Sequence, residues 1–480
     1  MNWLFLKDFA MCADTVNEPL LEHIILALRN GNCRAQGIFE QVISRNEVFG
    51  ERLNAYSQWQ PGNALASAIA IDHALAARRE PGLFAGIPVS AKDLFGLDGF
   101  QTFAGSPTAL PAEWCAEGPV VSALKSAGAA FMGKTNMVEF AFGGIGTNPH
   151  WEIPRNPWDR KTYRVSGGSS SGAGVSICEG TAFVALGSDT AGSVRVPASW
   201  TGTVGLKTTK NRWSTDGLVP LSTSLDTPGT LTRNVSDAIV AFSIIDPGTT
   251  ETFDKVLTKM RTRRISGLRI GVCKAMFDGC DPGVAESVAA ALILLEKAGA
   301  IVTDLEVPAI NEAEEIFERG GLAAPEFAAL INHTFADWKA TLDPNVLARF
   351  EKIEAIPAID YISRRSRLLE LASDVDTIFN DVDILVGPTV PITAPTVQEV
   401  AVPEEYFRLN MAALRNTSVV NLLDLCALSL PAGRDAFGIP IGFQVIARKN
   451  ADEELLAISL ACESVIGVSK DILGTPPLLA

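Results

Sequence analysis

Two short segments rich in glycine and serine constrain this chain more than any other feature of its sequence. Residues 167–172 read GGSSSG and residues 189–195 read DTAGSVR, so that Ser169 and Ser193 each lie beside a glycine. Serine–glycine runs alone are typical of flexible loops. Small residues, however, let a substrate carbonyl approach the backbone closely, and free N–H groups beside them can bind a developing oxyanion. Two such segments in one chain favour a catalytic turn that uses serine.

Lys92 supplies a third chemical group. It follows the apolar run at 87–89, which predicts a strand and a partly buried amine. Burial lowers the pKa of a lysine, and a neutral lysine can replace histidine as the base that activates a serine. A lone lysine is more often a solvated surface residue, but together with Ser169 and Ser193 it indicates acyl transfer at an amide-like carbonyl.

These segments resemble those of the amidase signature family, the Ser–cis-Ser–Lys hydrolases. The resemblance rests on VSGGSSSGAGVSICEG at 165–180, ALGSDTAGSVRVPASWTGTVGLKTT at 185–209, GIPVSAKD at 86–93 and GKTNMVEF at 133–140. It extends more weakly to 415–418 and 438–444 near the C-terminus. One departure is Ala191-Gly192, where the family often has two glycines. The alanine keeps its N–H group, so it serves an oxyanion hole only where its φ suits a residue with a Cβ.

The resemblance implies a fold. Length alone would suggest two or three domains of about 150 residues each. The family instead has an α/β fold, a single large α/β/α sandwich on a mixed, mostly parallel β-sheet. We therefore expect one amidase domain over residues 1–480, with a catalytic core at 65–240 and a variable helical substrate-specificity region at 310–380.

The resemblance also implies roles for individual residues. Ser193 is expected to be the nucleophile, and Ser169, after a cis peptide bond from Gly168, to pass its proton to neutral Lys92. The remaining expected roles are an oxyanion hole formed by the N–H groups of Thr190, Ala191, Gly192 and Ser193, an acyl pocket lined by Ala141, Phe142 and Gly143, and support from Ser170, Asp189 and Arg195. The expected reaction is hydrolysis of an amide-type C–N bond, including urea- or carbamate-like bonds, through an acyl-enzyme.

Other functions stay open at this point. The main alternative is the glutaminase subunit of a glutamyl- or aspartyl-tRNA amidotransferase complex, which would need a partner protein. The sequence TAGS in place of TGGS, together with Leu206-Lys207-Thr208-Thr209, favours a free-standing hydrolase. A catalytically dead scaffold would be expected to lack Lys92, Ser169 or Ser193, and all three are present.

Two further motifs fit less well. Residues 128–135 match the Walker A pattern, but a phosphate loop follows a strand and opens a helix, whereas here a helix is expected before an apolar strand. Residues 168–172 match G-x-S-x-G, but the residues before them are polar and only His333 follows as a histidine. An α/β-hydrolase needs an apolar strand before the serine and an acid-then-histidine order after it.

The composition limits the class of partner. The net charge of −15 disfavours direct binding to nucleic acid or to an anionic membrane, and no apolar run is long enough for a membrane span. The eight cysteines are dispersed without C-x-x-C spacing, and residues 1–8 lack a basic signal-peptide region. We expect a cytoplasmic enzyme with a small-molecule amide substrate, no cofactor and no metal, for which a homodimer is allowed.

Hydrophobic periodicity predicts alternating helices and strands. The expected helices are 18–30, 36–45, 64–79 and 120–127, and the expected strands are 87–91, 129–132, 268–273, 301–307, 383–388 and 441–447. Between 268–273 and 301–307 a helix is expected, with Asp281 as its cap, Pro282 at its first position and Gly299 at its end. Its apolar stripe is Val284, Val288, Ala291, Leu292 and Leu295.

Overall fold

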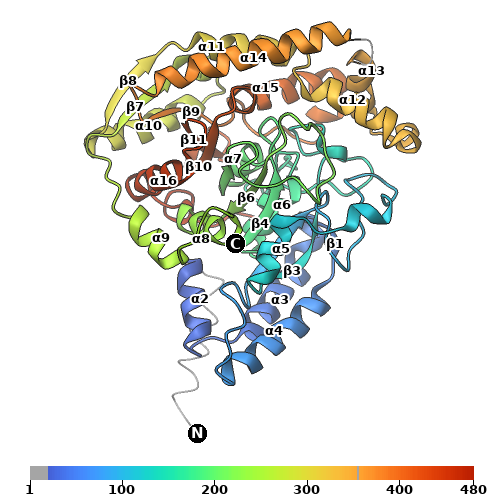
Figure 1. Ribbon diagram of the computed structural model, residues 1–480, viewed down its shortest axis with the longest axis vertical. Helices are drawn as coiled ribbons and strands as arrows, with labels where there is room; N and C mark the ends of the chain where they lie inside the picture. The colour runs from blue at the N-terminus through green and yellow to red at the C-terminus, as the bar shows by residue number, and fades with distance from the viewer. Residues whose placement is uncertain (1–19, 354–355) are drawn as a thin grey trace.

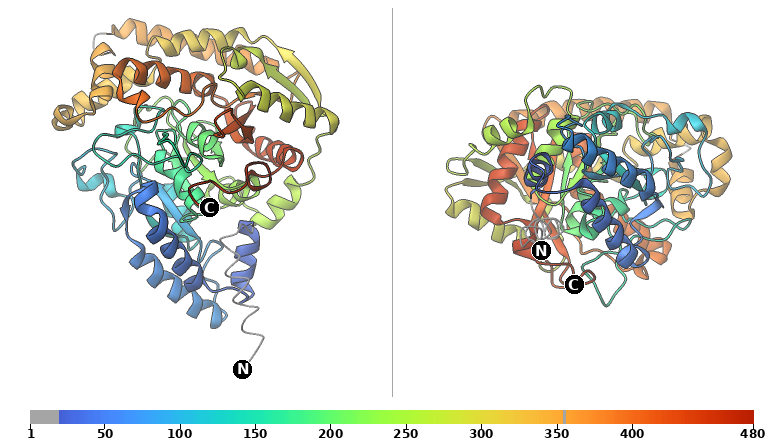
Figure 2. Two further views of the ribbon diagram at one scale, coloured as in Figure 1. Left: turned by 180° about the vertical axis from the view of Figure 1, so that it is seen from behind. Right: turned by 90° about the horizontal axis from the view of Figure 1, so that it is seen from below.

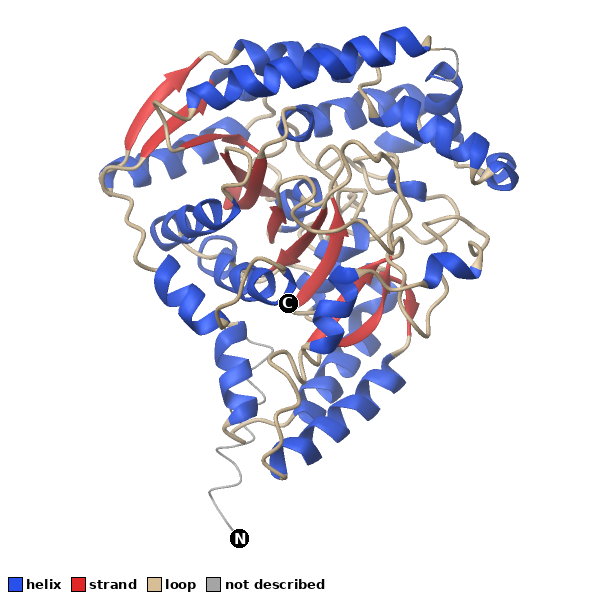
Figure 3. Ribbon diagram, in the orientation of Figure 1, coloured by secondary structure: helices blue, strands red, loops and turns tan. Residues whose placement is uncertain are grey.

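A computed structural model describes residues 20–353 and 356–480, which form helices around one long, twisted sheet (Figures 1 and 3). Among these residues the sheet has eleven strands in the order β1-β3-β2-β4-β6-β5-β10-β11-β9-β7-β8. The strands are β1 (Tyr56–Trp59), β2 (Pro88–Lys92), β3 (Ala130–Thr135), β4 (Val184–Ser188), β5 (Val204–Lys207), β6 (Pro228–Thr232), β7 (Arg269–Cys273), β8 (Ile301–Leu305), β9 (Ile384–Pro388), β10 (Cys426–Arg434) and β11 (Pro440–Ala447).

The α/β fold and the mixed sheet are confirmed, but the expectation of a mostly parallel sheet is wrong. Neighbouring described strands pair parallel at β2–β3, β2–β4, β7–β8 and β7–β9. They pair antiparallel at β1–β3, β4–β6, β5–β6, β5–β10, β10–β11 and β9–β11. The central strands are antiparallel because β10 turns directly into β11 and β6 follows β5 in the chain without a crossover helix, which parallel pairing requires.

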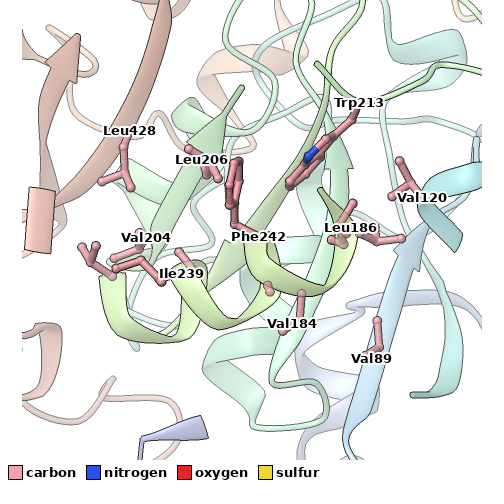
Figure 4. Packing of buried hydrophobic residues seen from close by; sticks show 14 of the residues in the cluster. Val89, Val120, Val184, Leu186, Val204, Leu206, Trp213, Ile239, Phe242 and Leu428 are labelled. Atoms are coloured by element: carbon pink, nitrogen blue, oxygen red, sulfur yellow. The ribbon is translucent and has the colours of Figure 1, made fainter. Parts of the chain in front are cut away.

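The helices cover both faces of the sheet. Along β4, Val184 and Leu186 point to the large core that contains Phe242 of α8 (Val235–Ile245), as Figure 4 shows. Ala185 points to the opposite face, where it joins a cluster with helices α6 (Ser171–Glu179) and α7 (Arg195–Thr201). Alternate residues of a strand point to opposite faces, so this strand lies between two helical layers.

The remaining helices extend these layers. They are α2 (Leu21–Arg29), α3 (Ala35–Leu53), α4 (Pro61–Ala76), α5 (Pro119–Ser126), α9 (Phe253–Met260), α10 (Val284–Lys297), α11 (Pro308–Glu318), α12 (Ala323–His333), α13 (Pro344–Ile353), α14 (Ala358–Ile378), α15 (Pro403–Leu422), α16 (Asp452–Ile466) and α17 (Ser469–Leu473). Figure 1 and the left view of Figure 2 show α11 to α15 together at one end of the molecule, far from α2, α3 and α4. No helix of the described residues is both long and apolar enough to cross a bilayer.

The expected elements are present, with differences at their ends. The stripe of α10 is buried at all five expected positions. Its start differs, because Gly283 is the N-cap and donates its N–H to Glu286 Oε2 at 3.0 Å. Asp281 instead accepts from the Thr393 N–H at 2.8 Å, so it joins two segments rather than capping the helix. The start of the first expected helix, the leading residues 1–8 and Cys12 lie outside the described residues.

Neither rejected motif has the structure that its chemistry needs. The Walker-like segment ends in the fully buried strand β3, where Lys134 forms an ion pair with Asp93 at 3.2 Å. Before the G-x-S-x-G match, residues 161–170 contain only isolated bridges at Arg164 and Val165 and no strand. The first segment therefore cannot wrap a phosphate, and the second is not a strand-to-helix elbow.

Candidate active site

Lys92 and Ser169 meet in the interior, beneath the start of α6. Lys92 ends β2 and donates from Nζ to Ser169 Oγ at 2.7 Å and to Ser188 Oγ at 2.8 Å. Neither the Lys92 nor the Ser169 side chain is exposed to solvent. The peptide bond between Gly168 and Ser169 is cis, as the resemblance implied. The structure thus brings together two residues that are 77 positions apart in the sequence.

The environment of Lys92 suits a base rather than a cation. Burial lowers the pKa of Lys92 to about 7, although the negative charges of Asp226 and Asp189 act in the opposite direction. No carboxylate of the described residues lies within ion-pair distance of its Nζ; the contacts are two serine hydroxyls. A lysine with a pKa near 7 is partly neutral at physiological pH and can accept a proton.

Ser193 lies at the wall of a cavity. It precedes α7 and lines a cavity of about 370 Å³ together with Thr190 and Ala191. Its carbonyl accepts from the Ser170 N–H at 3.2 Å, and the Ser170 hydroxyl donates to the Ser188 carbonyl at 3.4 Å. Ser170 therefore connects the turn that carries Ser193 to the strand that ends at Ser188.

The backbone N–H groups around Ser193 differ in whether they already donate a hydrogen bond within the protein. Gly192 donates its N–H to Asp189 Oδ1 at 2.8 Å. The N–H groups of Thr190, Ala191 and Ser193 have no acceptor among the described residues. Gly192 has φ +131°, whereas Ala191 has no positive φ. The alanine that departs from the family pattern therefore adopts an ordinary backbone conformation and keeps a free N–H at the cavity wall.

Asp189 and Arg195 form a buried ion pair that fixes this turn. Arg195 donates from Nη2 to Asp189 Oδ1 at 2.8 Å and from Nε to Oδ2 at 3.0 Å, and neither side chain is exposed. Its other acceptors are Gln444 Oε1, Asn421 Oδ1 and the Thr417 carbonyl. Burial alone would raise the pKa of Asp189, but Arg195 and then Lys207 bring it down to about 2. The carboxylate therefore stays ionised and holds the backbone of the turn.

The expected acyl pocket lies in the same cavity. Ala141, Phe142 and Gly143 all line it, together with the turn of Ser193. The rest of the wall comes largely from the helical end of the molecule, including Phe317 of α11, Arg349 of α13 and Leu414 of α15. The cavity therefore lies between the turn of Ser193 and the helical end of the molecule.

The Amidase family pattern matches residues 38–456. The chain belongs to the amidase signature family. It is 44% identical over 460 residues to the 2-amino-5-chloromuconic acid deaminase of Comamonas testosteroni, with 96% of this chain and 98% of the relative covered. It is 32% identical over 465 residues to a subunit of the glutamyl-tRNA(Gln) amidotransferase of a Synechococcus species, with 90% and 94% covered.

A solved amidase structure has the same fold. It superposes with a TM-score of 0.83 and 27% sequence identity, over 94% of this chain and 100% of the solved chain. The amidotransferase subunit is the more distant of the two sequence relatives. The chain is an enzyme that hydrolyses carbon–nitrogen bonds of the amide type.

Several residues of the amidase site were not found from the sequence. Ser188 contacts Lys92, and Asp226 accepts from Thr190 Oγ1 at 2.5 Å. Asn421 donates to Asp189 Oδ1 at 3.0 Å, and Thr417 donates from Oγ1 to the Ala191 carbonyl at 2.7 Å. The similarity at 415–418 and 438–444 was a signal for this region, but it did not identify which side chains reach the turn of Ser193.

Gly192→Ala is expected to lower the hydrolysis rate by about 10²-fold, because it displaces the free N–H groups beside Gly192. This is the usual cost of losing one oxyanion donor. An added Cβ at this position would lie 2.0 Å from Thr417 Oγ1, and φ +131° is rarely adopted by a side-chain-bearing residue. The turn must then shift, together with the N–H groups beside it. Steady-state kcat for ammonia release measures the effect. Ala191→Gly is the matched control and is expected to retain most of the activity, because Ala191 already has an ordinary φ. Equal losses in the two variants would contradict this account.

Proposed function

We propose that Ser193 is the nucleophile, Ser169 the proton relay and Lys92 the base of this amidase. The observation that carries the proposal is the 2.7 Å contact from Lys92 Nζ to Ser169 Oγ, made by an amine whose pKa lies at about 7. Ser193 passes its proton through Ser169 to Lys92 as its Oγ attacks the substrate carbonyl. The same proton then returns through the relay to the leaving nitrogen as the C–N bond breaks.

The oxyanion hole that we propose consists of the N–H groups of Thr190, Ala191 and Ser193. These three have no acceptor among the described residues, whereas the Gly192 N–H is donated to Asp189. Water then attacks the acyl-enzyme, and the relay operates in the reverse direction to release the acid. Ser170, Asp189 and Arg195 act as positioning residues, because their contacts hold the turn on which Ser193 lies.

We further propose a free-standing enzyme that acts on a small substrate, in the cytoplasm, without direct contact with nucleic acid, as a monomer or homodimer. The substrate would be distinguished by the helical region at 310–380, several residues of which line the cavity. The relative named for 2-amino-5-chloromuconic acid supports a small substrate from which nitrogen is released. The similarity to the amidotransferase subunit keeps a partner-dependent glutaminase as the second candidate.

Ser193→Ala is expected to abolish nitrogen release. Ammonia and amine release would be measured for the wild type and the variant with glutamine, aliphatic amides, aryl amides, ureas, carbamates and 2-amino-5-chloromuconic acid. Release from a substrate other than glutamine, absent in the variant, supports the proposal. Release from glutamine that requires an added partner protein would support the glutaminase, and full activity in the variant would eliminate Ser193 as nucleophile.

A further inference from the structure

The charge of the cavity wall is opposite to that of the chain. The chain has a net charge of −15, yet its cavity is lined by Arg319, Arg349 and Arg364 and by a single acidic residue among the described ones, Glu318. Arg319 forms an exposed ion pair with Glu315 at 3.5 Å. The guanidinium groups of the other two have no carboxylate of the described residues within ion-pair distance. Binding a neutral amide does not require arginine side chains in the cavity wall.

Arg349 differs from Arg195, the fully buried arginine near the site. Arg195 is saturated, with acceptors on Asp189, Gln444, Thr417 and Asn421. Arg349 donates from Nη1 to the Phe142 carbonyl at 2.8 Å, and its Nε and Nη2 have no acceptor among the described residues. Arg349 is partly exposed where it lines the cavity, and the burial of the rest of its side chain lowers its pKa. An arginine nevertheless stays protonated, so the positive charge remains uncompensated by the described part of the protein.

The orientation of the Arg349 guanidinium is fixed. Its Cζ lies 3.9 Å from the centroid of the Phe142 ring, so one face of the planar group is stacked. Phe142 is itself stacked on Phe327 of α12, with centroids 4.6 Å apart. With one face covered and Nη1 held by a carbonyl, the free N–H groups form the edge that a carboxylate binds with two parallel hydrogen bonds.

We infer that the substrate of this amidase carries a carboxylate group, and that Arg349 binds it while the scissile C–N bond lies at Ser193. This inference rests on the proposed function and adds the chemical class of the substrate. Most of the cavity wall is apolar, including Leu221, Phe317 and Leu414. A short hydrocarbon segment with an anionic end fits a cavity of about 370 Å³ with this distribution of groups.

The test is a binding measurement that needs no turnover. Titration calorimetry at pH 8 in the Ser193→Ala background would compare succinate, glutarate and adipate with their monomethyl and dimethyl esters, so that charge varies while chain length is matched. We expect at least one anion of the series to bind about 10- to 100-fold more tightly than its neutral diester, which is typical of hydrogen bonds to a charged group. Equal binding of acids and diesters, or no binding of any acid, would overturn the inference.

Variants assign the effect to Arg349. Adding Arg349→Met to the Ser193→Ala protein should remove the preference for the anion and leave binding of the diester unchanged, and Arg349→Lys should restore part of it. Arg408→Met, an exposed arginine of α15 outside the cavity, is the control and should change neither. A preference that persists in Arg349→Met would overturn the assignment.

The inference and the proposed function can fail separately. Comparing acids with diesters in the Ser193→Ala protein tests the inference even if Arg349→Met does not fold. The proposed function is tested by loss of nitrogen release in Ser193→Ala, which is a different measurement. A preference for anions without any nitrogen release by the wild type would therefore support the binding site and count against the proposed reaction.

Discussion

Lys92→Arg is expected to abolish hydrolysis, with kcat reduced by about 10³-fold or more, within the range for loss of a general base. Arginine remains protonated at every pH at which the protein is folded, so it cannot accept the proton from Ser169. The site also has no room for a larger cation, because Lys92 is fully buried between Ser169 and Ser188. Ammonia release under saturating substrate measures the effect, with circular dichroism to confirm the fold. Retention of a tenth of the wild-type rate would contradict the role of Lys92.

The pH dependence distinguishes a base from a structural lysine. In the proposed mechanism the neutral form of Lys92 is the active one, so kcat/KM of the wild type should fall about tenfold per pH unit below pH 7 and level off above it. Asp226 raises the pKa of Lys92 through its negative charge. Asp226→Asn should therefore move the acid limb to lower pH. If the acid side of the kcat/KM profile does not move in Asp226→Asn, or moves to higher pH, another group controls the rate. Burial raises the pKa of Asp226 itself to about 6. The acid side of the profile therefore reports the coupled titration of Lys92 and Asp226 rather than that of Lys92 alone.

Arg195→Met is expected to lower the free energy of unfolding by about 3–5 kcal/mol, the cost of leaving one partner of a buried pair uncompensated. The variant leaves the ionised Asp189 buried, with Asn421 and the backbone as its remaining donors. The folded-state pKa of Asp189 is depressed, so the stabilisation is present above the ordinary pKa of an aspartate and is lost as pH falls towards 2. Urea unfolding at pH 7 measures the difference. The difference in the free energy of unfolding between the wild type and Arg195→Met should become smaller as the pH falls towards 2.

The matched control is an arginine in an exposed ion pair. Arg408 donates to Glu405 at 2.8 Å on the surface of α15, and Arg408→Met should leave the unfolding midpoint unchanged because solvent screens such a pair. A comparable loss in both variants would show that the effect comes from removing any arginine. An unchanged midpoint in Arg195→Met would show that the buried pair contributes no stability to the turn.

The turns that carry Lys92, Ser169 and Ser193 could be predicted because their signal is local. Residues 86–93, 165–180 and 185–209 each carry a run of small or polar residues that few other functions need, and the structure brings Lys92 to Ser169 from two of these runs. The stripe of α10 was predicted for a similar reason, because burial on one face leaves a 3.6-residue period in the sequence. Both features can be recognised from residues that are close together in the sequence.

What the sequence did not predict depends on contacts between distant segments. Asp226 and Asn421 become part of the site only because the segment before β6 and the last turn of α15 lie beside the turn at 189–193. The sequence immediately around Asp226 and Asn421 contains no motif that indicates a role in the site. Arg349 is similar, since its place in the cavity follows from the packing of α13 against the wall at Phe142. The expectation of a mostly parallel sheet was also wrong, because strand runs in the sequence do not specify whether their neighbours are parallel.

The burial of Lys92 has a consequence for chemical reactivity. With a pKa of about 7, it is the amine of the site that would combine most readily with aldehydes and anhydrides, since ordinary lysines are protonated at neutral pH. Yet it is fully buried and is not part of the cavity wall, where Ser193 is accessible. Amine-directed reagents therefore label exposed lysines and spare Lys92, and an electrophile that enters the cavity meets the serine first. The fold thus shields Lys92, the base of the proposed mechanism, from Schiff-base adducts.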